Sequence, residues 1–335
     1  MNLAPNEEQG MMREMLRRFL GDRYDATTMA KGPISSADWR ALGELGLLAF
    51  LLPERAGGMD AGPEDVMLVA EEMGRSLAIT PLAESVLLCA RLLGQYGTQA
   101  QIDRWVEPVI NGLSMLAFAS GGSTNGERLT GDCGLVREGM AATGFVVATE
   151  GGGAVLVAAD AEGVGRTQVR LVDGSIAAAL SFEGAPCEVV EIPAGALAES
   201  TGLAELAVVA ETVGAMGTLF DLTLDYVKQR KQFGAILGSF QAIQHRCARL
   251  YILVEQARSM MIKASLAEPA QRADALLAAR AYVADAALRL AEDAVQLHGG
   301  MGVTEELAVG RGLRRVLLLT RLFGGAADAR AKLAA

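Results

Sequence analysis

The sequence is poor in the residues that build metal centres and disulfide frameworks. Its 335 residues include two histidines and four cysteines, and the cysteines are widely spaced with no Cys-x-x-Cys pair. There is also no His-Glu-x-x-His or His-x-His pattern. These absences argue against a histidine-based metal site, a cysteine zinc site and a disulfide framework, and they favour buried thiols.

Long apolar runs are missing as well. No stretch approaches about 18 uninterrupted apolar residues, the length of a membrane-spanning helix, and the first residues lack the basic and apolar regions of a signal peptide. With 51% hydrophobic and 21% charged residues, the chain can nevertheless bury a large core. We therefore expect a folded cytoplasmic protein that does not insert into membranes.

Basic clusters interleaved with aromatic residues, which are typical of nucleic-acid binding, are absent. Aromatic residues make up 5% of the chain and the formal net charge is −10, so we expect no nucleic-acid partner. The charge is uneven, because residues 1–195 hold 14 basic and 26 acidic residues whereas residues 196–335 hold 16 and 14. The C-terminal part therefore suits a small polyanionic ligand better than the rest of the chain does.

The apolar pattern divides the chain into three segments. Residues 1–112 have apolar residues at helical spacing, which predicts an all-α domain. Residues 113–195 change to short β-branched runs between glycine-rich turns, which predicts a small β barrel or sandwich. Its strands are expected at residues 145–148, 154–157, 169–172 and 188–192.

After Pro193 the helical pattern returns and is the strongest in the chain. Apolar residues from Leu206 to Val227 step by three or four, and two more long helices are expected over about 240–266 and 272–297. Alanine-rich faces let such helices approach closely, so residues 196–335 are predicted to form a four-helix bundle. The fold class is therefore mainly α with a small β domain.

Two motifs stand out in the predicted bundle. The first places Arg230 at the end of a long helix, just before a Phe-Gly turn, where a guanidinium can bind a phosphate. The second runs from Gln296 to Gly302 and puts glycines at a helix end, where the backbone can approach a ligand closely. Taken alone, each motif also fits an ordinary helix C-terminus with basic or glycine capping residues.

Together, these motifs and their order resemble the acyl-CoA dehydrogenase family, which has a helical N-terminal domain, a small middle β domain and a C-terminal four-helix bundle. The resemblance covers nearly the whole chain. It includes a Trp-to-Gly-Gly run over residues 39–58, Glu-Glu-Met-Gly-Arg over 71–75, Arg-Lys-Gln-Phe-Gly over 230–234 and Gln-Leu-His-Gly-Gly-Met-Gly over 296–302. It implies an FAD-dependent oxidoreductase of fatty acid or steroid catabolism that acts on an acyl-CoA.

The resemblance also implies an FAD shared between two subunits and bound mainly by the neighbouring one. It assigns four residues to the adenosine diphosphate half of that FAD and three to its pyrophosphate: Arg230, Gln232, Phe233 and Gln241, then Gln296, Gly299 and Gly300. A cofactor shared in this way requires at least a dimer. The expected partners are therefore an acyl-CoA and a second subunit, either a copy of this chain or a different acyl-CoA dehydrogenase subunit.

The middle segment departs from the family pattern. A Thr-Glu-Pro-x-x-Gly-Ser-Asp run usually holds the isoalloxazine ring there, whereas residues 117–124 read Ala-Phe-Ala-Ser-Gly-Gly-Ser-Thr. Phe118, Ser120 and Ser123 are candidates to replace some of those contacts, and the family's Trp-x-Thr strand is absent too. Such middle domains resemble those of hetero-oligomeric bacterial acyl-CoA dehydrogenases, in which one subunit type is catalytically incomplete.

The family's chemistry needs a carboxylate that removes the α-proton of the acyl-CoA while the β-hydrogen leaves as hydride to flavin N5. The usual glutamate position matches Phe323, which cannot accept a proton. A second family position matches Ala204, so Glu205 is a catalytic candidate only if the register shifts by one residue. The alternative is that Glu205 is an acidic residue in the first turn of a helix. Glu211 is a poorer candidate.

Three functional hypotheses follow. The first is FAD-dependent α,β-dehydrogenation of an acyl-CoA thioester, by this chain alone or in a complex. The second is a binding partner that contributes Arg230, Gln296 and its bundle to the FAD of another subunit, which supplies the base and the substrate pocket. The third is a flavin oxidase or monooxygenase that kept the scaffold and changed the chemistry.

Overall fold

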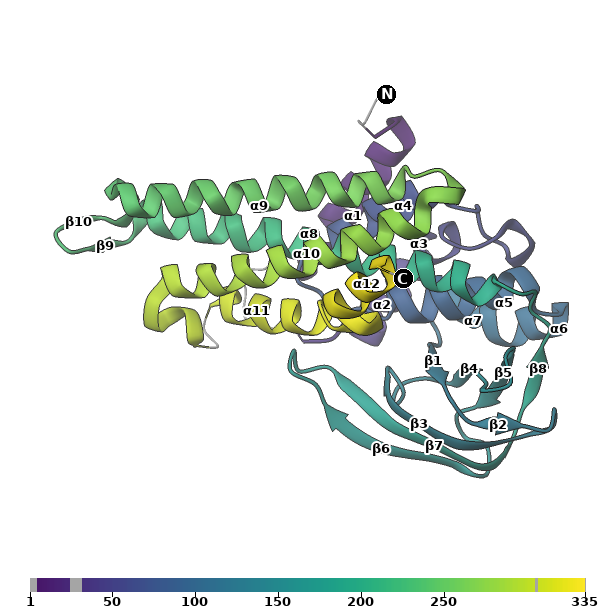
Figure 1. Cartoon of the computed structure of the whole chain (residues 1–335). Helices are drawn as coiled ribbons and strands as arrows, with labels where there is room; N and C mark the ends of the chain where they lie inside the picture. The colour runs from purple at the N-terminus through teal and green to yellow at the C-terminus, as the bar shows by residue number, and fades with distance from the viewer. Residues whose placement is uncertain (1–4, 25–31, 305–306, 335) are drawn as a thin grey trace. The chain divides into compact units, whose positions relative to one another are not determined.

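The computed structural model describes residues 5–24, 32–304 and 307–334 (Figure 1). The chain forms two compact units, each built from separate stretches of sequence. One unit consists of Met1–Gly32, Pro63–Ile79 and Glu205–Ala335, and the other consists of Pro33–Gly62 and Thr80–Ala204. The boundaries of these units do not coincide with the predicted domain boundaries at residues 112 and 195. The division into three domains therefore stays a prediction from the sequence.

Helices build most of the first unit, and four long ones confirm the predicted bundle: α8 (Ala196–Gln229), which belongs to this unit from Glu205 on, α9 (Gln241–Ser265), α10 (Pro269–His298) and α11 (Ala308–Leu319). They run side by side in Figure 1, and the alanine-rich α10 packs against α9, α11 and the short α12 (Gly325–Ala334). Two helices from the N-terminal part of the sequence, α1 (Glu7–Arg23) and α4 (Pro63–Arg75), complete the unit.

Helices α4 and α8 touch through their backbones. A Cβ atom on Gly74 would lie 1.9 Å from the carbonyl oxygen of Glu211, and one on Gly214 would lie 2.1 Å from the carbonyl oxygen of Glu71. No side chain larger than hydrogen fits at either place. The glycine of the Glu-Glu-Met-Gly-Arg motif therefore has a packing role.

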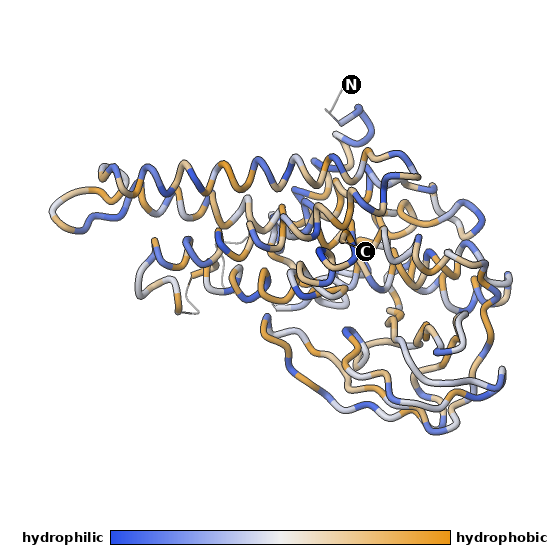
Figure 2. The backbone as a smooth tube through the Cα atoms, viewed as in Figure 1, coloured by the Kyte–Doolittle hydropathy of each residue, from blue (hydrophilic) through white to orange (hydrophobic). Residues whose placement is uncertain are grey.

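Helix α8 is long and apolar enough to cross a membrane by length and composition, but 78% of its most apolar 18-residue window is buried inside the protein. Figure 2 shows polar residues recurring between apolar ones along the long helices. This is the pattern of helices that bury one face and expose the other. The apolar character of α8 is thus explained by its place in the core.

The helices of the second unit are short: α2 (Ser36–Glu44), α3 (Leu47–Phe50), a 3₁₀ turn η1 (Glu54–Ala56), α5 (Arg91–Tyr96), α6 (Gln99–Gln101) and α7 (Glu107–Ile110). Two segments have π-type hydrogen bonding, η2 (Leu82–Ala90) and η3 (Ile102–Val106). They lead directly into α5 and α7. The helical character predicted for residues 1–112 therefore holds here, with the first part of each helix more widely wound.

Two four-stranded sheets form the rest of this unit, in the orders β1-β4-β5-β8 and β2-β3-β7-β6. The strands are β1 (Leu116–Ser120), β2 (Ser123–Thr124), β3 (Arg128–Arg137), β4 (Gly144–Ala148), β5 (Ala154–Ala158), β6 (Val164–Arg170), β7 (Ile176–Pro186) and β8 (Glu188–Val190). Strand β1 pairs with β4 in parallel, and the other described pairs in these sheets are antiparallel. Phe145 and Phe182 meet edge to face across the core, with ring centroids 6.0 Å apart.

Three of the four predicted strands are confirmed as β4, β5 and β8, whereas the strand expected at 169–172 is misplaced and overlaps a strand only at residues 169 and 170. The chain forms β6 over Val164–Arg170 instead, at the edge of its sheet, where most side chains are exposed and polar and leave no apolar pattern. Strands β3 and β7 were not predicted, for related reasons. Gly131 and Gly134 interrupt β3 near two register shifts, and β7 begins with a run of small alanines.

Candidate functional site

Helix α8 ends where the sequence predicts, and Arg230 follows it directly. Its backbone N–H donates to the carbonyl of Tyr226 at 2.9 Å, and its own carbonyl accepts from the N–H of Leu237 at 2.9 Å. Between these bonds the chain turns back through the hairpin of β9 (Lys231–Gln232) and β10 (Ala235–Ile236). In the described part of the chain, the exposed guanidinium of Arg230 makes no hydrogen bond or ion pair.

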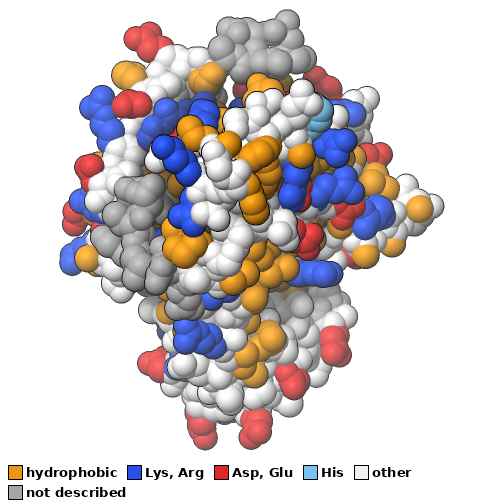
Figure 3. Space-filling view, turned by 90° about the vertical axis from the view of Figure 1, so that its left-hand side faces the viewer, with side chains coloured by type: hydrophobic (Ala, Val, Ile, Leu, Met, Phe, Trp, Pro, Cys, Tyr) orange, Lys and Arg blue, Asp and Glu red, His pale blue; other side chains and the backbone are white. Residues whose placement is uncertain are grey.

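Phe233 and Gly234 form the two-residue turn of this hairpin, with φ of 55° and 79°. Positive φ at both central residues suits Asn-Gly, and a phenylalanine there is strained. The side chain of Phe233 is 88% exposed, so little packing within the chain offsets the strain. Figure 3 faces this end of the bundle and shows apolar side chains next to lysine and arginine side chains. Phe233 is therefore a strained residue that its own chain leaves uncovered.

A cavity of about 430 Å³ lies beside Arg230, lined also by Asp225, Tyr226 and His298. The ring of His298 is 5% exposed and stacks on Tyr226 with centroids 4.2 Å apart. Burial lowers the pKa of His298, although its Nδ1 lies 2.8 Å from the carbonyl oxygen of Ala294, a contact that opposes the shift. The ring is therefore neutral at pH 7 and donates from Nδ1, because a carbonyl can only accept.

Gly299 and Gly300 follow His298 and are exposed. Gly299 has a φ of 62°, and no atom would lie within 4 Å of a Cβ on either glycine, so the backbone there is open to a ligand. The two predicted motifs thus meet at the cavity through Arg230 and His298. The other cofactor candidates of the bundle do not line this cavity and are exposed: Gln232, Phe233, Gln241, Gln296, Gly299 and Gly300.

Phe118 and Ser120 lie on β1 in the second unit. Phe118 is half-buried and Ser120 is exposed, and in the described part of the chain the hydroxyls of Ser120 and Ser123 make no hydrogen bond. A free hydroxyl on the same strand as a partly exposed aromatic ring can contact a flavin ring. In the first unit, taken by itself, the unpaired Arg230 and the open glycines can contact phosphate groups.

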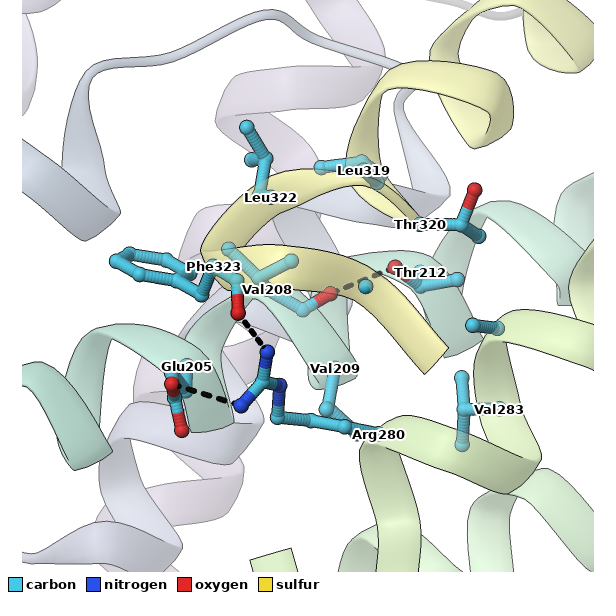
Figure 4. Close-up of a pocket in the computed structure, with 12 residues that line it drawn as sticks. Glu205, Val208, Val209, Thr212, Arg280, Val283, Leu319, Thr320, Leu322 and Phe323 are labelled. Carbon is cyan, nitrogen blue, oxygen red and sulfur yellow. Dashed lines mark hydrogen bonds and ion pairs between the residues drawn. The ribbon is translucent and has the colours of Figure 1, made fainter. Parts of the chain in front are cut away.

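Glu205 and Phe323, two candidate positions for a catalytic carboxylate, share one small cavity (Figure 4). Arg280 of α10 joins them: its Nη1 lies 2.8 Å from Oε1 of Glu205, and its Nη2 donates to the carbonyl oxygen of Phe323. The side chains of Arg280 and Glu205 are 7% and 13% exposed. The cavity measures about 20 Å³, which is room for one water molecule.

Burial raises the pKa of the Glu205 carboxyl, and the positive charge of Arg280 opposes that shift. A carboxylate with a raised pKa is a stronger base. This one, however, already accepts a hydrogen bond from a buried guanidinium, which occupies the oxygen and favours the charged form against the effect of burial. The geometry therefore gives Glu205 an ion-pairing role with a partner on another helix.

One expectation about Glu205 is corrected. Helix α8 begins at Ala196, so Glu205 lies in its third turn, and the explanation as a first-turn acidic residue is wrong. The pattern of large apolar residues starts at Leu206, which made the helix look shorter than it is. Ala204 is fully buried and has no ionisable group. Glu211 is paired with Arg315 at 2.5 Å, so it is not a free base either.

Arg280 is the residue that sequence reasoning missed. It is the one charged residue between Ala275 and Ala284, on the alanine-rich face of α10. A long charged side chain on such a face needs a buried partner, since an unpaired charge in a core is costly. That isolated position is the signal that could have found it. The stacking partner Tyr226 was likewise missed, although it lies four residues before Arg230 on α8.

Comparisons with known proteins identify the family. The model of the acyl-CoA dehydrogenase N-terminal domain matches residues 6–113, and the model of the C-terminal domain matches residues 197–335. The acyl-CoA dehydrogenase FadE27 of Mycobacterium tuberculosis is 31% identical over 300 residues, which cover 82% of this chain and 80% of FadE27. The chain belongs to the acyl-CoA dehydrogenase family, a family of oxidoreductases.

Solved structures have the same fold. The ChsE4–ChsE5 complex from Mycobacterium tuberculosis contains a chain with a TM-score of 0.89 and 25% identity, over 100% of this chain and 98% of that one. The FAD complex of PigA has a TM-score of 0.87 at 20% identity, over 100% and 98% of the two chains. The predicted fold class, mainly α with a small β domain, is confirmed.

Proposed function

We propose that this chain is a subunit of an FAD-dependent acyl-CoA dehydrogenase that carries out α,β-dehydrogenation of an acyl-CoA thioester together with a second, different subunit. In that assembly it helps to bind FAD through Arg230 and the His298 end of α10, and the other subunit supplies the base. The observation that carries the proposal is the ion pair of Glu205 and Arg280, in a cavity with room for one water molecule.

The chemistry explains why that ion pair matters. FAD supplies the hydride acceptor when it is bound. Removal of the α-proton needs a carboxylate that can come within hydrogen-bond distance of the substrate carbon. Phe323 has no such group, and the carboxylate of Glu205 is 87% buried against Arg280. The arrangement favours an anchored Glu205 over a catalytic one.

The Arg230 side chain supports the cofactor part of the proposal. A guanidinium pairs with phosphate oxygens through two parallel hydrogen bonds, and the donors of Arg230 are unused within the described chain. The neutral ring of His298 forms a rigid wall beside it because both the ring face and Nδ1 are engaged. The likeness to the ChsE4–ChsE5 complex, whose name gives two different proteins, favours a hetero-oligomer.

A second candidate function is catalysis by Glu205 of this chain. It is favoured by the raised pKa of that carboxyl, which burial causes. This function requires Arg280 to release Glu205 when a substrate enters, since the cavity is too small for an acyl chain beside the ion pair.

Exchange of the α-protons of butyryl-CoA with D₂O separates the two functions, because exchange needs the base alone. We expect the flavin-loaded chain, purified without a partner, to exchange no faster than its Glu205→Gln variant. Glu255→Gln, at an exposed carboxylate of α9, is the matched control. Fast exchange that Glu205→Gln abolishes and Glu255→Gln preserves would support catalysis by Glu205 and contradict the incomplete subunit.

A further inference from the structure

Another cavity of the first unit, of about 270 Å³, is lined by none of the cofactor or catalytic candidates discussed above. It lies among α1, α4 and the C-terminal half of α9. Its polar lining includes three arginines, one from each helix: Arg13, Arg75 and Arg258. Its apolar lining consists of Met67, Leu68, Met261, Ile262 and Leu266, with Pro5 at one end.

Two of the three arginines, Arg13 and Arg258, donate hydrogen bonds to carboxylates. The carboxylate of Glu71 is 4% exposed, and its two oxygens lie 3.2 Å from Nη2 of Arg258 and 3.5 Å from Nη2 of Arg13. Arg13 also places its Nε 2.5 Å from Glu72, and Arg258 lies 3.3 Å from Glu255. Their charges are therefore compensated within the chain.

Arg75 is different. Its ion pairs with Glu71 and Asp221 are long, at 4.0 and 3.9 Å, and lie beyond hydrogen-bond distance. Within the described residues its guanidinium makes no hydrogen bond, and its Nε is shielded from solvent. The group lies over Gly217 of α8, where a Cβ would stand 3.5 Å from Nη2. The Arg75 side chain is 29% exposed, so its Nη groups can donate to an acceptor from outside the chain.

The rest of the cavity indicates what carries that acceptor. The side chains of Met67, Leu68 and Met261 are nearly buried, at 9%, 5% and 1% exposure, and give the cavity an apolar wall. A carboxylate matches the fork of a guanidinium, and its single charge is tolerated near Glu71 better than the two charges of a phosphate. The acidic groups of Glu64, Asp221 and Glu255 are exposed, and solvent screens them.

We propose that this cavity binds a carboxylate with an apolar tail, whose oxygens accept hydrogen bonds from Arg75 and whose tail lies along Met67, Leu68 and Met261. The site lies within one subunit and uses none of the flavin-binding candidates. Its occupation would add contacts among α1, α4 and α9 and stabilise the folded chain, by an amount that grows with the logarithm of the ligand concentration above Kd.

Isothermal titration calorimetry and thermal unfolding of the flavin-loaded full chain with sodium octanoate test the proposal. The comparison ligands are 1-octanol and inorganic phosphate. We expect octanoate to bind and to raise the melting temperature, and both comparison ligands to bind at least tenfold more weakly. Arg75→Gln should weaken octanoate binding tenfold or more, because the carboxylate loses its charged donors. Arg75→Lys should lose less octanoate affinity than Arg75→Gln, because it keeps the positive charge. Arg17→Gln, which changes an arginine of the same network outside the cavity, should bind normally.

Ile262→Trp gives an independent test that keeps Arg75. A tryptophan at this position fills the cavity, so octanoate binding should be lost even if Arg75→Gln fails to fold. Unchanged octanoate affinity in folded Arg75→Gln or in Ile262→Trp overturns the proposal, and so does equal affinity for octanol or for phosphate. Octanoate could instead bind in an acyl-CoA site of the chain. In that case Arg75→Gln would leave the octanoate affinity unchanged, so this proposal can fail without any failure of the proposed function.

Discussion

Arg230 and Arg280 belong to the same helical bundle and have opposite surroundings. Arg280 is 7% exposed, donates hydrogen bonds to Glu205 and to the carbonyl of Phe323, and faces a cavity of about 20 Å³. Arg230 is exposed, has no partner in the described chain and faces a cavity of about 430 Å³. A guanidinium with satisfied donors holds a fold together, whereas one with unused donors beside open space is available to a ligand.

The largest effect is expected for Arg280→Met. It leaves the carboxylate of Glu205 buried without a partner, which destabilises a protein by about 3–5 kcal/mol. Chemical denaturation should show this loss, and the double variant Glu205→Gln with Arg280→Met should recover part of it, because no charge then stays unpaired. A single variant as stable as the wild-type protein would show that the pair does not anchor the helices.

The same variant has a defined pH dependence. The folded-state pKa of Glu205 is raised, so its protonation stabilises the folded protein at acidic pH, and this stability is lost as the pH rises through that pKa. Without Arg280 the pKa rises further. The deficit of Arg280→Met should therefore be largest at neutral pH and shrink toward acidic pH, as measured by denaturation at a series of pH values. A deficit that grows toward acidic pH would contradict the assignment.

Arg230→Ala should change binding and leave folding intact. Loss of a charged pair with the FAD phosphates weakens flavin binding by about 10- to 100-fold, since each such hydrogen bond contributes roughly 1.5–3 kcal/mol. The ratio of flavin to protein absorbance after purification measures the effect. Lys228→Ala, at an exposed lysine near the end of α8, is the control. Unchanged flavin content in a folded Arg230→Ala variant would show that Arg230 does not hold the cofactor.

Association should accompany flavin binding. The strained, exposed Phe233 and the unpaired Arg230 at the end of the bundle are features that a second subunit would complete. Analytical ultracentrifugation is expected to show a dimer or larger species, with a second subunit or with a copy of this chain. A monomer at micromolar concentration that keeps its FAD would break the link between the hairpin and the cofactor.

The smallest effect is expected for Phe233→Asn. Asparagine adopts the left-handed conformation of residue 233 more readily than phenylalanine, which should stabilise the isolated chain by about 0.5–1 kcal/mol. If the ring contacts a partner or its cofactor, the same variant weakens association. Thermal unfolding and sedimentation of one sample measure both changes. A variant that loses stability would show that the ring packs within its own chain.

The sequence predicts the bundle better than the sites within it. Apolar spacing marks α8, α9 and α10 because each buries a long continuous face, and the Phe-Gly turn after Arg230 follows from residue type. Strand β6 and the start of α8 are misplaced because exposed polar residues and small alanines carry no such signal. The pairing of Glu205 with Arg280 joins residues 75 positions apart, so no local pattern reveals it.

The central claim is that this chain holds a flavin and lacks a free base. The most direct test of this claim adds butyryl-CoA anaerobically to the purified, flavin-loaded chain and measures the flavin absorbance. We predict no bleaching by the chain alone and rapid bleaching once a complete acyl-CoA dehydrogenase subunit is bound to it. Rapid bleaching by the chain alone, undiminished in Glu205→Gln, would contradict both the incomplete subunit and the catalytic role of Glu205.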